Sequence, residues 1–136
     1  MTTSHRIGFI GVGAMGKSIL AGLIQSEQVS PDDISIVSKS EARADWVSQQ
    51  FNVQRHSCID TLAQSCDVIL LCVKPKDLSV VAGKMERVDL SGKLLISTLA
   101  GVSMKSLRDK FPEPFLVRSI PNIASEVGEG VTLWSA

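Results

Sequence analysis

Three glycines near the start of the chain have a spacing that suits the binding of phosphate. Gly11, Gly13 and Gly16 form a G-x-G-x-x-G pattern between an apolar run at 6–11 and a second apolar stretch at 17–24. In such a turn the first glycine permits a tight bend, the second lets a phosphate approach the backbone, and the third lets helix and strand pack closely. The amides that open the following helix attract an anion. The pattern predicts the pyrophosphate site of a dinucleotide, with a purely structural turn as the alternative.

The loop after the second apolar run bears on which dinucleotide would bind. An acidic residue in this loop accepts the ribose 2′-hydroxyl of NAD. This chain has Ser38, Lys39 and Ser40 there instead, with Arg43 close behind, and we expect the nearest acid, Glu41, to open the next helix and point elsewhere. Two hydroxyls and one or two cations suit a phosphate dianion. The loop therefore predicts NADP(H) as the preferred cofactor with NAD(H) possible; the alternative is a set of solvated loop residues.

Apolar runs alternate with stretches of helical periodicity along the chain. Strands are expected at 6–11, 34–37, 52–56, 67–73, 94–97, 115–120 and 130–134. Helices are expected at 14–27, 41–51, 59–64, 77–85 and 103–110, the second with Trp46 and Val47 on its inner side and the last with Ser103 as its N-cap. The repeating order predicts an α/β fold, a doubly wound, mainly parallel Rossmann-type sheet with helices on both faces. No linker or repeat divides residues 1–136, which we expect to form a single dinucleotide-binding domain.

Composition argues against several other classes of protein. Lys plus Arg and Asp plus Glu are equal at 14 each, which argues against a nucleic-acid or membrane-surface role. No apolar run reaches the roughly 18 residues that cross a bilayer, and the amino terminus lacks a signal-peptide layout, so a cytoplasmic protein is expected. Cys58, Cys66 and Cys72 have neither disulfide nor zinc spacing, so no metal is expected, and the last two suit buried positions. His5 and His56 are expected on the surface or in loops.

Four segments carry motifs that occur together, in the same order, in one enzyme family. They are Ile7 to Gly16, Asp67 to Pro75, Ser97 to Ser103, and Arg118 to Asn122 with the following Val127 to Gly130. In that order they resemble the opening glycine turn, the V-K-P turn after a strand, the S-x-x-A-G-[IV] segment and the R-x-M-P-N motif of the pyrroline-5-carboxylate reductases. The resemblance covers essentially the whole chain.

The resemblance implies roles for individual residues at a cofactor site. The pyrophosphate would be held by the backbone of Gly11, Gly13, Ala14, Met15 and Gly16, and the adenosine ribose phosphate by Ser38, Lys39 and Ser40. The nicotinamide half would be lined by Val73, Lys74, Pro75, Leu99, Ala100 and Gly101, with Asn122 near the ring or the substrate. Lys74 and Asn122 are candidates for positioning, and no acid or base is assigned. Pro75 could simply end a strand and Gly101 simply supply a turn.

The chemistry implied by the resemblance is delivery of a hydride to the C=N bond of 1-pyrroline-5-carboxylate, which gives L-proline in proline biosynthesis. A protonated imine is already electrophilic, so the protein has mainly to orient two reactants and exclude water. Two departures from the family pattern stand out: Ile120 replaces a methionine, and Ile123-Ala124-Ser125 stands where Thr and then Pro are common. The second departure bears on the course of the loop near the nicotinamide.

Members of that family continue into an α-helical domain that builds a dimer and much of the substrate pocket. We therefore expect this chain to be part of a longer two-domain enzyme that forms a homo-oligomer through the helical domain, and to be inactive or weakly active alone. Two alternatives are a non-catalytic NADP-binding module and a related F420-dependent NADP reductase, whose glycine turn is similar. A methyltransferase is disfavoured, because it usually has an acidic residue where this chain has Ser38, Lys39 and Ser40.

Overall fold

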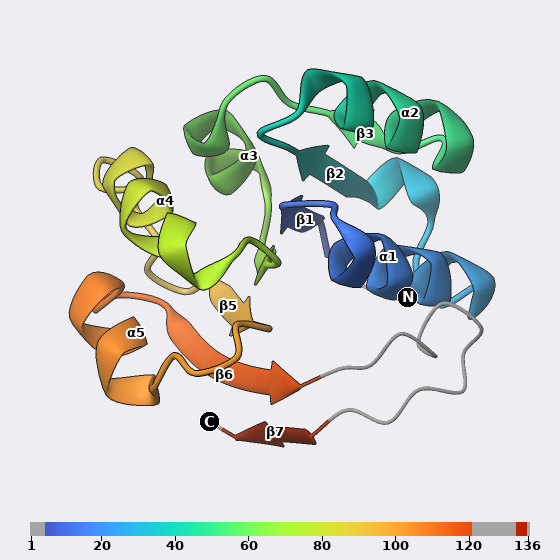
Figure 1. Cartoon of the computed structure of the whole chain (residues 1–136). Helices are drawn as coiled ribbons and strands as arrows, with labels where there is room; N and C mark the ends of the chain where they lie inside the picture. Colours follow the sequence, from blue (N-terminus) through green and yellow to red (C-terminus); the bar gives the residue numbers. More distant parts are fainter. Residues whose placement is uncertain (1–4, 121–132, 136) are drawn as a thin grey trace.

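A computed structural model describes residues 5–120 and 133–135 of the chain (Figure 1). The described strands form one sheet in the order β3-β2-β1-β4-β5-β6-β7. Their bounds are β1 Ile7–Ile10, β2 Ile34–Val37, β3 Gln54–Arg55, β4 Val68–Leu71, β5 Leu94–Ser97, β6 Phe115–Ile120 and β7 Leu133–Ser135. All neighbours pair in parallel except β7, which runs antiparallel to β6 with Ile120 opposite Leu133. The predicted doubly wound, mainly parallel sheet is confirmed. Of the last predicted strand, residues 130–132 lie outside the described part of the chain.

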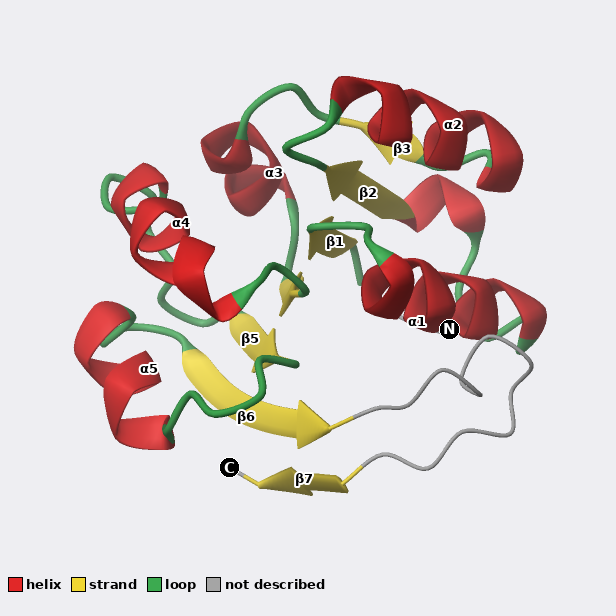
Figure 2. Cartoon of the chain, viewed as in Figure 1, coloured by secondary structure: helices red, strands yellow, loops and turns green. Residues whose placement is uncertain are grey.

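Five α-helices and two 3-10 turns connect the described strands (Figure 2). The helices are α1 Ala14–Gln25, α2 Glu41–Phe51, α3 Ile59–Ser65, α4 Leu78–Lys84 and α5 Met104–Lys110, and the 3-10 turns are η1 Pro31–Asp33 and η2 Pro75–Asp77. Ser40 caps α2 by accepting a hydrogen bond from Arg43 N (3.2 Å), and Ser103 caps α5 as predicted, by accepting one from Ser106 N (3.1 Å). None of the described helices is both long and apolar enough to span a membrane.

The helices cover the two faces of the sheet with separate apolar clusters. Phe9 of β1 lies in the cluster beneath α1 and α2, and its neighbour Ile10 lies in the cluster beneath α3, α4 and α5. Successive side chains of a strand point to opposite faces, so β1 is buried from both sides. β1 sits between β2 and β4, and the strand order reverses there. In open sheets of this kind, ligands bind beyond the carboxyl ends of the strands at such a reversal.

The predicted inward position of Trp46 is wrong. Trp46 is 52% exposed, whereas Ala44 and Val47 of the same helix are buried. Residues three apart share one face of a helix, and a residue between them is turned away from it. The indole instead lies beside α1, with Lys17 Nζ 5.3 Å from the ring centroid.

Candidate functional site

A cavity of about 1050 Å³ opens at the carboxyl ends of β1, β2 and β4, where the strand order reverses. Its walls include the glycine turn, the loop after β2, the loop between β3 and α3, and the segment after β4. Among the described residues that line it, six are basic and three are acidic: Lys39, Arg43, Arg55, Lys74, Lys76 and Lys84 against Glu41, Asp60 and Asp77. The chain as a whole has no net charge. The positive charge is thus concentrated at this cavity, which suits an anionic ligand.

The three positions of the turn are glycine for different structural reasons. Gly11 has a φ of +95°, and a Cβ there would meet the Cys72 carbonyl oxygen at 2.7 Å. A Cβ on Gly16 would meet the carbonyl oxygen of Gly11 and, at 3.2 Å, the Cβ of Cys72. These two positions therefore need glycine for the turn itself and for the packing of α1 against the end of β4.

Gly13 has no such internal reason to be glycine. A Cβ at Gly13 would have Arg43 Nη1 at 3.8 Å as its nearest neighbour, which is ordinary van der Waals contact, and Gly13 lines the cavity. Its backbone (φ −70°, ψ −161°) is open to other residues. Gly13 is also the N-cap of α1, and a glycine leaves the first amides of the helix without a side-chain acceptor. The missing side chain leaves room for a group in the cavity, of the size of a pyrophosphate, to approach this backbone.

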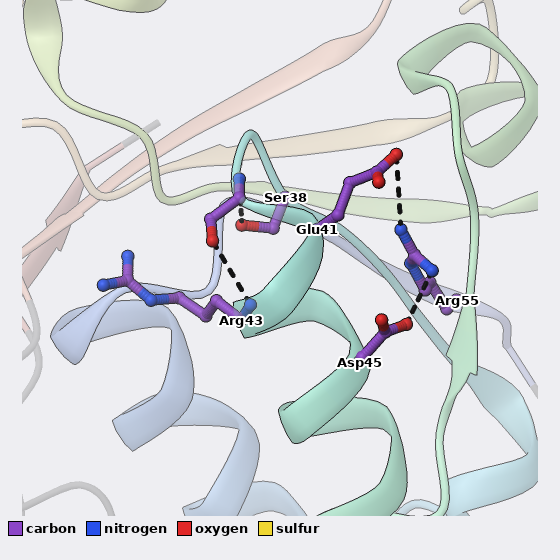
Figure 3. Close-up of polar contacts among 6 residues, drawn as sticks. Ser38, Glu41, Arg43, Asp45 and Arg55 are labelled. Carbon is purple, nitrogen blue, oxygen red and sulfur yellow. Dashed lines mark hydrogen bonds and ion pairs between the residues drawn. The ribbon is translucent and has the colours of Figure 1, made fainter.

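The loop after β2 presents hydroxyl groups whose oxygens already accept hydrogen bonds (Figure 3). Ser38 Oγ accepts from Ser40 N at 3.3 Å, and Ser40 Oγ accepts from Arg43 N at 3.2 Å. A hydroxyl that accepts one bond keeps its own proton to donate. Between the two serines, Lys39 is 84% exposed, and its Nζ lies 3.6 Å from Asp77 Oδ1 of η2. This loop and the start of α2 can therefore donate hydrogen bonds and positive charge to an anion.

Glu41 begins α2, as the sequence predicts, and its carboxylate is held by an arginine from the next strand. Arg55 Nη2 lies 3.8 Å from Glu41 Oε1, and Arg55 Nη1 donates a 2.6 Å hydrogen bond to Asp45 Oδ1. Glu41 and Arg43 extend to opposite sides of the start of α2 (Figure 3). Arg55 was not identified from the sequence. The available signal was its place at the end of an expected strand, because loops at that edge of a parallel sheet meet.

The segments expected to line the nicotinamide half are only partly brought together. Val73 and Lys74 line the cavity, whereas Pro75 begins η2 and is absent from the lining. Of the residues expected at the pyrophosphate, Ala14, Met15 and Gly16 are also absent from the lining. Leu99 is 5% exposed and packs in the core, and neither Ala100 nor Gly101 lines the cavity. Gly101 has a φ of +75°, so its backbone conformation favours glycine. Asn122 lies outside the described residues.

The loop after β5 is nevertheless tied to the end of β4. Thr98 donates twice to the carbonyl oxygen of Leu71, from its backbone N at 3.1 Å and from Oγ1 at 2.8 Å. This contact brings the start of 98–101 to the edge of the sheet that carries the cavity. The segment 98–101 therefore lies near the edge of the sheet that carries the cavity, but Leu99 does not line the described wall of the cavity.

Two of the three cysteines, Cys66 and Cys72, are not placed for nucleophilic chemistry. Burial raises the pKa of the Cys72 thiol to about 11, and burial also raises the pKa of the Cys66 thiol. Both thiols are therefore protonated at neutral pH, and a thiol is a poor nucleophile. Cys58 is exposed on the wall of the cavity. Residues 5–120 contain no cluster of three or more His, Cys, Asp or Glu that could hold a metal ion.

Comparisons with known proteins agree with this geometry. The model of a family described as NADP oxidoreductase coenzyme F420-dependent matches residues 6–101. The chain is 33% identical to a pyrroline-5-carboxylate reductase of Synechocystis over 98% of its own length and 49% of the relative, and 34% identical to that of Escherichia coli over 93% and 48%. The crystal structure of Plasmodium falciparum pyrroline carboxylate reductase with NADP bound superposes with a TM-score of 0.85 at 26% identity, over 96% of this chain and 47% of that one. The chain spans about half the length of these relatives.

Proposed function

The chain belongs to the family of coenzyme F420-dependent NADP oxidoreductases, and on that premise we propose that its cavity binds NADP(H) for a reductase of the pyrroline-5-carboxylate type. The observation that carries the proposal is Gly13, whose missing side chain leaves open the space above the first amides of α1. Two serine hydroxyls and two cations lie at the next loop, where the adenosine ribose would fall. The relatives named pyrroline-5-carboxylate reductase support the choice of reaction.

Each part of the proposed site has a defined task. The backbone of Gly11, Gly13, Ala14, Met15 and Gly16 would hold the pyrophosphate, the three glycines by their geometry and the other two through their amides at the start of α1. Ser38 and Ser40 would donate their hydroxyl protons to a 2′-phosphate, and Lys39 and Arg43 would balance its charge. NADP(H) fits this donor set better than NAD(H), which would offer no anionic partner to Arg43 and would leave Lys39 paired with Asp77.

The nicotinamide half of the site would lie beyond the end of β4. Val73 and Lys74 line the cavity there, and Pro75 fixes the turn into η2. Leu99, Ala100 and Gly101 would set the course of the neighbouring loop through the Thr98 contact, and Asn122 would position the ring or substrate. Lys74 would bind and orient a substrate carboxylate rather than transfer a proton.

When bound, NADPH supplies the hydride that reduces the C=N bond of 1-pyrroline-5-carboxylate to the secondary amine of L-proline. The protonated imine is electrophilic before it binds, so the chain has to orient two reactants and exclude water. That task needs no acid–base pair beside the reacting atoms.

We propose that residues 1–136 form one dinucleotide-binding domain and supply the cofactor half of this reaction. The similarity over about half of each relative supports this assignment. The whole protein would then act as a cytoplasmic homo-oligomer, in line with the resemblance of its motifs to those of the reductase family.

A second candidate function is reduction of NADP by reduced coenzyme F420, the reaction in the family's description. The match to residues 6–101 favours it, whereas the relatives that match over nearly the whole chain favour the imine. A third candidate is an NADP-binding module without catalysis. Assays of the full-length protein with NADPH and either pyrroline-5-carboxylate or F420 separate the three.

The test of the cofactor site is a calorimetric titration of the chain with NADPH and, separately, NADH. We expect NADPH to bind more tightly, and Gly13→Ala to lower its affinity by about tenfold or more, because a methyl group would fill the space of the pyrophosphate. Gly83→Ala is the matched control, since no atom lies within 4 Å of a Cβ at that position. A chain that binds neither nucleotide, or a Gly13→Ala variant that binds like the parent, would contradict the proposal.

A further inference from the structure

The guanidinium group of Arg55 joins two carboxylates of α2 on the wall of the cavity (Figure 3). Arg55 ends β3, the two-residue edge strand, and lies opposite Ile36 of β2. From there its Nη1 donates to Asp45 Oδ1 at 2.6 Å, and its Nη2 lies 3.8 Å from Glu41 Oε1. The short bond to Asp45 orients the guanidinium group, which lies within ion-pair distance of the Glu41 carboxylate.

Stability alone gives a weak reason for this arrangement. Glu41 is 86% exposed and Asp45 is 54% exposed, and ion pairs at such exposure contribute little to folding. The Nε of Arg55 is buried and has no hydrogen-bond partner in the described part of the chain. An unpartnered buried donor is costly, and an apolar side chain would avoid that cost. The arginine is better explained by what it does to its neighbours.

Glu41 is the acidic residue closest in sequence to the loop that would hold the 2′-phosphate. It follows Ser40 directly, begins α2, and lines the same cavity as Ser38 and Lys39. A carboxylate free to turn toward those hydroxyls would repel a phosphate dianion. It would also accept the 2′-hydroxyl of an unphosphorylated ribose, as the acidic residue of NAD-binding sheets does.

We propose that Arg55 is a specificity-determining positioning residue, which holds the Glu41 carboxylate away from the loop at 38–40. A 2′-phosphate then meets hydroxyls and cations only. The inference rests on the proposed function, because it concerns the choice between a phosphorylated and an unphosphorylated ribose at the same cavity. Arg55 acts through Glu41 and Asp45 in this account and makes no contact of its own with the phosphate.

The test compares the binding of 2′,5′-ADP with that of 5′-AMP, which differ only in the 2′-phosphate. We expect Arg55→Gln to lower the ratio of the two affinities roughly two- to fivefold, the range of an exposed ion pair such as the one that Arg55 makes with Glu41. Glu41→Gln should keep the ratio at or above that of the parent chain. The double variant Glu41→Gln/Arg55→Gln should behave like Glu41→Gln, because the carboxylate that Arg55 restrains is then gone.

Three control variants test whether a change in the affinity ratio is specific to the contact between Arg55 and Glu41. Arg87→Gln removes one positive charge from an exposed position after α4 that does not line the cavity, and it should leave the ratio unchanged. Asp45→Asn should lower the ratio less than Arg55→Gln does, and adding Glu41→Gln should restore it. This pair also serves if Arg55→Gln fails to fold, which thermal melts followed by circular dichroism would reveal.

The possible results distinguish a failure of the inference about Arg55 from a failure of the proposed function. If the parent chain prefers 2′,5′-ADP and Arg55→Gln does not change the ratio, this inference is wrong and the proposed function stands. If the double variant loses the preference as fully as Arg55→Gln alone, Arg55 contacts the phosphate itself and the positioning role is wrong. A parent chain that binds neither nucleotide contradicts the proposed function and this inference together.

Discussion

Lys39 Nζ lies 3.6 Å from Asp77 Oδ1, so an ion pair connects the loop after β2 to η2 along the wall of the cavity. Lys39 is exposed and Asp77 is less so, at 84% and 26% of their side-chain surfaces. The Asp77 carboxylate pairs with the cation that the proposed function assigns to a 2′-phosphate. On that proposal, the two anions would compete for one ammonium group.

We expect Asp77→Asn to increase the affinity for NADPH by about two- to fivefold, the range of an exposed ion pair of up to about 1 kcal/mol. The affinity for NADH should change less, because NADH carries no 2′-phosphate. Titration of both cofactors at low and at physiological salt measures the effect. Asp109→Asn, an exposed carboxylate on α5, is the matched control. Weaker NADPH binding by Asp77→Asn would show that Asp77 supports the site instead of competing with the ligand.

Glycine-to-alanine changes at Gly11 and Gly13 of the glycine turn should have different effects on the free energy of unfolding. Gly11→Ala should destabilise the chain by more than about 2 kcal/mol, because its φ is +95° and a Cβ would stand 2.7 Å from a carbonyl oxygen. Gly13→Ala should leave the free energy of unfolding within about 0.5 kcal/mol of the parent, since its Cβ would have no protein atom closer than 3.8 Å. Urea denaturation measures both. Equal losses of stability in the two variants would contradict the division of roles between these glycines.

Ser40 and Ser103, the N-caps of α2 and α5, form a natural matched pair. Ser40→Ala and Ser103→Ala should each lower the free energy of unfolding by about 1 kcal/mol, because each hydroxyl accepts a bond from an otherwise unpaired amide. Only Ser40→Ala should also weaken NADPH binding, since Ser40 lines the cavity and Ser103 does not. Denaturation and titration of both variants provide the comparison. NADPH binding that is unaffected by Ser40→Ala would remove that hydroxyl from the proposed phosphate site.

The buried Cys72 thiol should make stability fall at alkaline pH. Its pKa is raised from 9.0 to about 11 by burial, so between these values the unfolded chain has lost a proton that the folded chain keeps. Stability from this group is complete below pH 9 and is lost as the pH rises toward 11, by about 3 kcal/mol in all. Denaturation midpoints at pH 8 to 11 measure the loss. Cys72→Ala, which cannot titrate at this position, should show a shallower decline.

The same burial predicts a pattern of thiol reactivity. At pH 8 a disulfide reagent should modify the exposed Cys58 in the folded chain. The buried Cys66 should react only after unfolding, and the half-buried Cys72, whose pKa is raised to about 11, should react more slowly than Cys58. Saturation with NADPH should slow the reaction of Cys58, because that residue lines the cavity. Modification of Cys66 and Cys72 as fast as that of Cys58 in the folded chain would contradict the burial that raises the pKa of Cys66 and Cys72.

Much of the fold and part of the site could be predicted from the sequence because the signals are local. Gly11, Gly13 and Gly16 follow an apolar strand directly, and Ser38 to Ser40 follow the next one, so both loops fall at the same edge of any parallel sheet. Val73 and Lys74 line the cavity for the same reason. In each of these segments the chain order alone fixes which end of the sheet a residue reaches.

The parts that could not be predicted depend on contacts between distant segments or on the rotation of a helix. Arg55 reaches Glu41 only because β3 pairs with β2 at one register, and a two-residue strand specifies register weakly. Trp46 is apolar and adjacent to Val47, but the face that packs on the sheet is set by Ala44 and Val47. Leu99 belongs to a segment at the correct edge, and its side chain turns into the core instead.

The fit between Gly11, Gly16 and Cys72 has a consequence for synthesis on the ribosome. The glycine turn is shaped against the end of β4, whose Cys72 carbonyl and Cβ occupy the space beside the two glycines. Until the chain has been made as far as Cys72, the turn has no surface to pack against, although its own residues have already been synthesised. A nascent chain stalled before that point would therefore carry the complete glycine sequence and yet lack the contact that shapes the turn.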